Sequence, residues 1–231
     1  MHRFCAMIAL YMDGVTPGNP LRPTSARPYY AFFWTFVEYP DWFRSSQVGW
    51  HDICVVRETS VKEIPGGVSA VMSRILEIFF SEDEYNFDTL GVRVAGPRII
   101  KASFGAFLLD ERAEKAIVGV TGSSGSKPCM SCRNVVARIE PERVERGFRH
   151  FTLPGLGGCS LHTHESFTAD LEYLKAIHGT MGKTAFKKQQ QFMGICYEPH
   201  GLLFGPMQRI AKLPETRMHG EQHDFSKHNI S

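Results

Sequence analysis

The chain has 231 residues, of which 43% are hydrophobic and 22% are charged. Both fractions lie near the globular average, which excludes a wholly disordered chain, a collagen-like repeat and a coiled coil. The formal charge of +2 at pH 7 is too small to indicate nucleic-acid binding unless the basic residues cluster locally.

Three β-like runs open the chain. Residues 4–12 are almost continuously apolar and stop at Asp13, which predicts a central strand with an acid at its carboxyl end. A signal sequence is less favoured because no small-x-small cleavage site follows this run. After a loop rich in proline and glycine, residues 29–37 and 50–56 are aromatic or β-branched. Three successive strands predict an antiparallel meander.

A helix and a fourth strand follow the meander. Apolar residues recur at helical spacing between about 67 and 81, and β-like residues 98–109 lead directly into Asp110. Helix-favouring residues 111–117 come next. This order would place the first and fourth strands side by side in parallel. The pattern predicts an α/β fold whose residues 1–118 form a partial ribonuclease-H-like core with a mixed sheet.

Asp13 and Asp110 end the two strands that this topology makes neighbours. Carboxylates at corresponding strand ends can converge on Mg²⁺ or Mn²⁺, which prefer oxygen ligands and can promote phosphodiester cleavage. The alternative is that each Asp is only a turn residue. We therefore treat the two acids as candidate catalytic residues.

Residues 119–166 contain Gly/Ser turns and a C-x-x-C pair, Cys129 and Cys132. Such an irregular segment has little apolar content to order it, and a thiolate pair at this spacing can chelate structural Zn²⁺. Free thiols and a redox pair are the alternatives. The candidates for the remaining zinc ligands are Cys159, His162 and His164.

Residues 167–231 predict two helices and a tail. The helices are expected over 167–177 and 183–195, separated by glycines, and from residue 199 onward no periodicity is evident. Basic residues gather over 173–197 and 127–149 and could follow a phosphate backbone, or they could form ordinary solvated faces.

The six cysteines are too few for a disulfide scaffold of this length. No apolar run reaches the ~20 residues that cross a bilayer. We therefore expect an intracellular protein, nuclear or cytoplasmic, that has no membrane partner.

Taken together, the motifs resemble the transposases of CACTA-type (En/Spm-like) DNA transposons and their relatives in protist genomes. The resemblance runs from about residue 10 to residue 223. The matching pieces are a first-Asp motif, an aromatic-rich strand, a second Asp before a small-residue helix, and a Gly-rich turn followed by C-x-x-C. These pieces lie at residues 10–19, 29–39, 107–110 and 122–132.

The resemblance implies metal-dependent DNA cleavage and strand transfer, with transposon-end DNA as the partner and self-association as a further expectation. Asp13 and Asp110 would be the first two acids of a DDE-type site, and Cys129 and Cys132 a metal-binding pair. Where family members show Asp-x-Met-His, this chain has Gly220 in place of the Asp, and Glu221 is the nearest candidate for a third acid.

The chain also stops at Ser231, before a downstream region that would supply the family's last acid and closing helices. We therefore expect a transposase-derived piece that binds metal weakly and does not cleave DNA at a normal rate. Whether the chain is an enzyme stays open at this point. The alternative is a zinc-stabilised nucleic-acid-binding or interaction module without catalysis.

Overall fold

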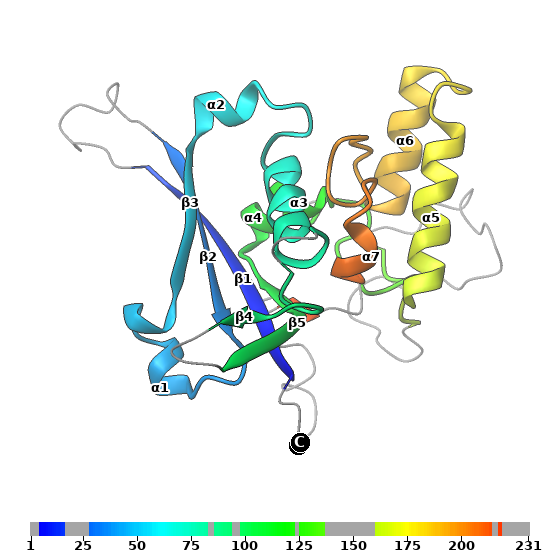
Figure 1. The fold of residues 1–231 in the computed structure, drawn as a ribbon. Coiled ribbons are helices and arrows are strands. Elements are labelled where there is room, and N and C mark those ends of the chain that lie inside the picture. The colour runs from blue at the N-terminus through cyan, green and yellow to red at the C-terminus, as the bar shows by residue number, and fades with distance from the viewer. Residues whose placement is uncertain are drawn as a thin grey trace, which may run out of the picture.

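The protein is described by a computed structural model that covers residues 5–16, 28–82, 86–93, 98–122, 125–136, 160–213 and 217–218. It has a mixed α/β fold built on one mixed, curled sheet (Figure 1). The strands are β1 (Cys5–Val15), β2 (Tyr29–Phe36), β3 (His51–Arg57), β4 (Val92–Arg93), β5 (Ile99–Leu108) and β6 (Arg217–Met218).

The sheet has the strand order β3-β2-β1-β5-β4, and β6 pairs with β5. Strands β1, β2 and β3 form an antiparallel meander, which confirms that prediction. Strand β5 lies parallel to β1, as expected for the first and fourth predicted strands. The carboxyl ends of β1 and β5 therefore lie at the same edge of the sheet.

Strand β1 differs from the prediction at its end. It does not stop at Asp13 but continues to Val15, because β2 pairs with it as far as Tyr29. Its pairing with β5, in contrast, ends at Tyr11. Only Ile8 to Tyr11, inside the apolar run, pair with neighbours on both sides.

In Figure 1 helices α3 to α7 lie on one side of the sheet, with α3 and α4 nearest to it, whereas the short α1 and α2 lie at opposite ends of β3. The short ones are α1 (Asp41–Arg44), the 3-10 turn η2 (Gln47–Gly49), α2 (Glu58–Lys62) and α7 (Gln208–Ala211). The long ones are α3 (Gly67–Phe80), α4 (Glu111–Val118), α5 (His164–Ile177) and α6 (Lys183–Met193).

Helices α3 and α4 confirm the predicted ranges to within a residue. The apolar face of α3 is buried through Met72, Ile75 and Leu76, which belong to the same cluster as the alternating β1 residues Ile8 and Leu10. Apolar residues that recur every 3.6 residues on the helix and every second residue on the strand thus pack in one core.

Helix α5 begins three residues before the predicted start at Phe167. Thr163 accepts a hydrogen bond from the backbone N–H of Ser166, and Ser166 reciprocates, which forms a capping box. The first turn is polar, so hydrophobic periodicity does not reveal it.

The stretch after residue 199 has no predicted element, yet much of it is buried. Five apolar residues here are at most 4% exposed: Leu202, Leu203, Met207, Ala211 and Leu213. They join the same cluster as the sheet and α3. These residues lie in compact turns and in the single turn of α7, which are too short to show a hydrophobic periodicity in the sequence. Among the described residues, no helix has the length and hydropathy needed to cross a membrane.

Candidate functional site

Asp13 lies near the carboxyl end of β1 and is half-buried. Its neighbour Met12 is 2% exposed and points into the core. Successive side chains of a strand point to opposite faces, so Asp13 lies on the face away from this core, together with Tyr11.

A β-bulge determines which residue of β5 lies opposite Asp13. Ile8 pairs with Phe104 but Ala9 pairs with Ala106, so Gly105 is the extra residue. Pairing then continues to Tyr11 and Leu108. Two residues further along in the same register, Asp13 would face Asp110. Without the bulge, Asp13 would face Leu109, so the extra residue is what aligns the two acids.

Asp110 is the N-cap of α4. Its Oδ1 accepts a hydrogen bond of 2.6 Å from the backbone N–H of Ala113. The turn-residue interpretation is therefore correct as far as it goes. The cap uses one carboxylate oxygen, and the other oxygen can still serve as a ligand.

Tyr11 links the two acids electrostatically. The pKa of its phenol is raised, first by burial and then by the charge of Asp13 and a hydrogen bond to it, with a smaller effect from Asp110. One hydroxyl thus lies within reach of both carboxylate charges. Sequence reasoning missed Tyr11, although its position two residues before Asp13 on a strand indicates the same face.

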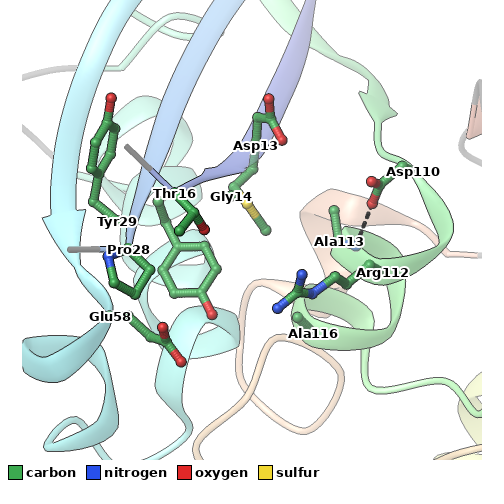
Figure 2. Close-up of a pocket in the computed structure, with 12 residues that line it drawn as sticks. Asp13, Gly14, Thr16, Pro28, Tyr29, Glu58, Asp110, Arg112, Ala113 and Ala116 are labelled. Atoms are coloured by element: carbon green, nitrogen blue, oxygen red, sulfur yellow. Dashed lines mark hydrogen bonds between the residues drawn. The ribbon is translucent and has the colours of Figure 1, made fainter. Parts of the chain in front are cut away.

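Both acids are among the residues that line one pocket between the end of the sheet and α4, and Figure 2 shows the Asp13 carboxylate directed away from Arg112 and Glu58. Figure 2 shows the guanidinium of Arg112 reaching from the first turn of α4 into this pocket, and Glu58 lies on its opposite side. Glu58 is held by an ion pair of 2.8 Å with Lys62. Arg112 was also missed, because a lone arginine after an N-cap has no distinctive sequence pattern.

The donor set of the pocket fits a hard divalent cation, because carboxylate oxygens are the ligands that Mg²⁺ and Mn²⁺ prefer. Within the described ranges, no three His, Cys, Asp or Glu residues gather around one point. The acids of the pocket lining are Asp13, Asp110 and Glu58, and Glu58 is already paired with Lys62. The third candidate acid, Glu221, lies outside the described residues.

A second cluster forms around the C-x-x-C pair. Cys132 makes an isolated antiparallel bridge with Leu161, and the N–H of His162 donates to the carbonyl of Ser131 at 2.8 Å. The segment of Cys132 therefore lies alongside that of His162, as a shared zinc site requires. Cys159 is outside the described residues, and His164 is the first residue of α5.

His162 lies at the centre of this cluster. Its side chain is 1% exposed, its Nδ1 is 3.1 Å from Ser166 Oγ, and its Nε2 is 2.9 Å from Lys127 Nζ. Burial, followed by the charges of Lys127 and Arg133, lowers the pKa of His162 to about 3. The pKa of Lys127 is also lowered, mainly by burial. His162 is therefore neutral at physiological pH.

Glu114 lies beside the same cluster. Burial, then the charges of Cys129 and Glu111, raises its pKa to about 7, while Lys115 opposes the shift. Two thiols and a neutral imidazole are donors that suit Zn²⁺. Among the described residues of this cluster, too, no three His, Cys, Asp or Glu residues gather around one point. Zinc binding by Cys129, Cys132 and their partners therefore remains a prediction.

Helix α6 carries an exposed basic group. Lys183, Lys187 and Lys188 are all exposed, and the helix contains no acidic residue. A phosphate backbone could lie along such a face.

No family model, curated protein or solved structure matches this chain. The geometry of the two clusters and the pattern of motifs are therefore the grounds for a functional proposal.

Proposed function

We propose that this is a transposase-derived protein with a ribonuclease-H-like core, related to the CACTA-type transposases. In this proposal Asp13 and Asp110 bind Mg²⁺ or Mn²⁺ at a DNA phosphodiester. The insertion around Cys129 and Cys132 is held together by structural zinc. The DNA ends of a transposon are the expected partner, and self-association is the expected assembly.

The observation that carries the proposal is the alignment of the two acids at one edge of the sheet. Asp13 lies near the end of β1 and Asp110 comes just after β5, and these are the only two strands of the described chain that run parallel over more than two paired residues. Continued two residues past the last pair, Tyr11 and Leu108, the register set by the bulge at Gly105 would put Asp110, instead of Leu109, opposite Asp13. A bulge disrupts the ladder locally, so a bulge that aligns two carboxylates supports a role for them.

The residues of the pocket have distinct roles in this proposal. Asp13 and Asp110 supply carboxylate oxygens to the cation, which when bound would polarise the phosphodiester and activate the attacking oxygen. Asp110 is positioned by its bond to the N–H of Ala113. The guanidinium of Arg112 carries a fixed positive charge into the pocket and would pair with a phosphate oxygen.

Two acids support metal binding better than they support turnover. In-line displacement needs charge stabilisation on both the attacking and the leaving oxygen, which generally takes two metals and at least three acids. We therefore infer weak metal binding and DNA binding, with cleavage far below the rate of a complete transposase.

A zinc-stabilised binding module without catalysis is the second candidate, and the exposed basic face of α6 favours it. Such a module binds DNA through Lys183, Lys187 and Lys188. It does not need Asp13 and Asp110 to share a cation, so the two candidates differ in their dependence on the acids.

The deciding experiment measures DNA binding and plasmid nicking with and without Mn²⁺. The variant is Asp13→Asn, and Asp52→Asn on the exposed part of β3 is the matched control. The proposal predicts that Mn²⁺ strengthens DNA binding by wild type and the control and not by Asp13→Asn, with little nicking. Binding that is indifferent to Mn²⁺ and to Asp13 would favour the module. Rapid nicking abolished by Asp13→Asn would show a complete enzyme.

A further inference from the structure

Lys127 and His162 form a buried pair that the proposed DNA site does not use. Lys127 is 8% exposed, the ring of His162 is 1% exposed, and Nζ and Nε2 are 2.9 Å apart. Burying an ammonium group is costly unless it is hydrogen-bonded. This geometry requires one nitrogen to donate and the other to accept.

The neighbours of the ring determine which nitrogen accepts. Ser166 Oγ donates to the carbonyl of Thr163 (3.1 Å) and accepts from the N–H of Thr163 (3.0 Å). The hydroxyl proton of Ser166 is thereby used, so Ser166 accepts from Nδ1 of His162 at 3.1 Å. The proton of the neutral ring is on Nδ1, and the lone pair of Nε2 points at Lys127.

This tautomer is the one that a metal ligand needs when it binds through Nε2, with the other ring nitrogen held by a hydrogen bond. Cys129 and Cys132 lie close enough for their charges to act on Lys127. The pairing of Cys132 with Leu161 brings the two segments together immediately before His162. The Lys127 ammonium is thus within range of the charges of both thiols, and its Nζ lies 2.9 Å from Nε2 of the imidazole.

We propose that Nε2 of His162 is the ligand that joins Cys129 and Cys132 in the zinc site, and that the Lys127 ammonium competes with the metal for this lone pair. The inference rests on the zinc-bound insertion proposed above. Nε2 has a single lone pair, so it serves Lys127 or the metal but not both. Asp170, whose Oδ2 is 4.0 Å from Nε2, provides negative charge for the displaced ammonium.

The described residues are not arranged for metal binding, because no three potential ligands gather around one point there. Metal binding then requires Lys127 to withdraw and both thiols to release their protons to solvent. His164 lies beyond the paired segment, in the first turn of α5, and is not a ligand in this arrangement.

The test titrates the full chain, kept reduced, with Co²⁺ and then displaces it with Zn²⁺. Thiolate-to-cobalt absorption reports binding directly and needs no DNA or enzymatic activity. The variants are His162→Ala and Lys127→Met, with His164→Ala and the exposed-lysine change Lys187→Met as matched controls. Circular dichroism checks that each variant is folded.

We expect Lys127→Met to bind Co²⁺ at least about tenfold more tightly than wild type, because a competing charge is removed, and Lys187→Met to match wild type. His162→Ala should lose at least about tenfold in affinity while His164→Ala changes little. Equal affinities for Lys127→Met and Lys187→Met, or a larger loss in His164→Ala, would overturn the inference and leave a zinc site with other ligands. A wild-type chain that binds neither metal would overturn the zinc insertion as well. If His162→Ala is unfolded, the comparison of the two lysine variants decides alone.

Discussion

The hydroxyl of Ser69 accepts a 2.8 Å hydrogen bond from the backbone N–H of Leu202, across 133 positions of the chain. The same hydroxyl donates to the carbonyl of Ile117 at the end of α4. All three residues are buried. One side chain of α3 therefore joins the helix after the candidate site to the carboxyl-terminal part of the core.

Ser69→Ala should destabilise the fold by about 1–3 kcal/mol, because it leaves the N–H of Leu202 and the carbonyl of Ile117 buried without this partner. Urea unfolding followed by circular dichroism measures the change. Ser73→Ala, on the same helix at a half-buried position, is the control and should cost less. Equal losses in both variants would show that the hydroxyl bridge contributes nothing specific.

Gly105→Ala tests the bulge. A Cβ at this position would lie 2.8 Å from Met7 Cβ and 3.3 Å from the carbonyl oxygen of Ile8. The strands must shift to relieve this overlap, so we expect a loss of about 1–3 kcal/mol in unfolding free energy. In Gly14→Ala, on the same sheet, the new Cβ makes an ordinary 3.7 Å contact with Tyr30. A Gly105→Ala protein as stable as Gly14→Ala would contradict the tight approach of β1 and β5.

Glu114 should make stability depend on pH. Its folded pKa of about 7 lies above the ordinary value of 4.5, so the folded protein holds this proton more tightly than the unfolded chain. The contribution of this bound proton to the free energy of unfolding is complete below pH 4.5. It is lost as the pH rises through 7, because the buried carboxyl must then ionise.

Glu114→Gln cannot ionise and should escape this loss. In metal-free buffer containing a chelator, we expect it to be more stable than wild type at pH 8, by on the order of 1–3 kcal/mol after allowance for partial exposure, and the two to be similar at pH 4.5. Glu172→Gln on α5 is the control, since Glu172 is exposed. Thermal unfolding curves at the two pH values measure the difference in stability between Glu114→Gln and wild type. If this difference were the same at both pH values, the raised pKa of Glu114 would be wrong.

Tyr11 should report on both acids. Asp13→Asn removes the charge and the acceptor that raise the pKa of its phenol, so that pKa should fall towards the ordinary tyrosine value. Ultraviolet titration measures this pKa. The curve of each protein, wild type or Asp13→Asn, is corrected by subtracting the curve of the same protein carrying Tyr11→Phe, which leaves the signal of the Tyr11 phenol alone. Asp110→Asn should lower the pKa less, in line with the smaller effect of that residue. An unchanged titration in both variants would mean that the phenol does not contact this site.

The sequence predicts those parts of the fold whose residues repeat with a period. The helix α3 follows from Val71, Met72, Ile75 and Phe79 at helical spacing, and β1 follows from its apolar run. Asp110 is predictable as the boundary between β5 and α4, because an acid before a helix-favouring segment is a common N-cap. These features depend on local interactions, which a pattern can show.

Other features depend on long-range geometry. Nothing near Gly105 reveals a bulge, because the bulge exists only in the pairing of β5 with β1. The burial of Leu202 and Met207 arises from packing against helices more than a hundred residues earlier in the chain. The sequence around Lys127 predicts an ordinary surface lysine, because its contact with His162 exists only in the folded chain.

If Asp13 and Asp110 share a divalent cation, both carboxylates should contribute to Mn²⁺ binding, which electron paramagnetic resonance measures. Asp110→Asn is well suited because an asparagine oxygen can still cap α4 while the charge is removed. Asp13→Asn is the second variant and Asp52→Asn the control. We expect wild type and Asp52→Asn to bind Mn²⁺ alike, and each of the other two variants to lose at least about tenfold in affinity. Undiminished Mn²⁺ binding by both Asp13→Asn and Asp110→Asn would contradict a shared cation.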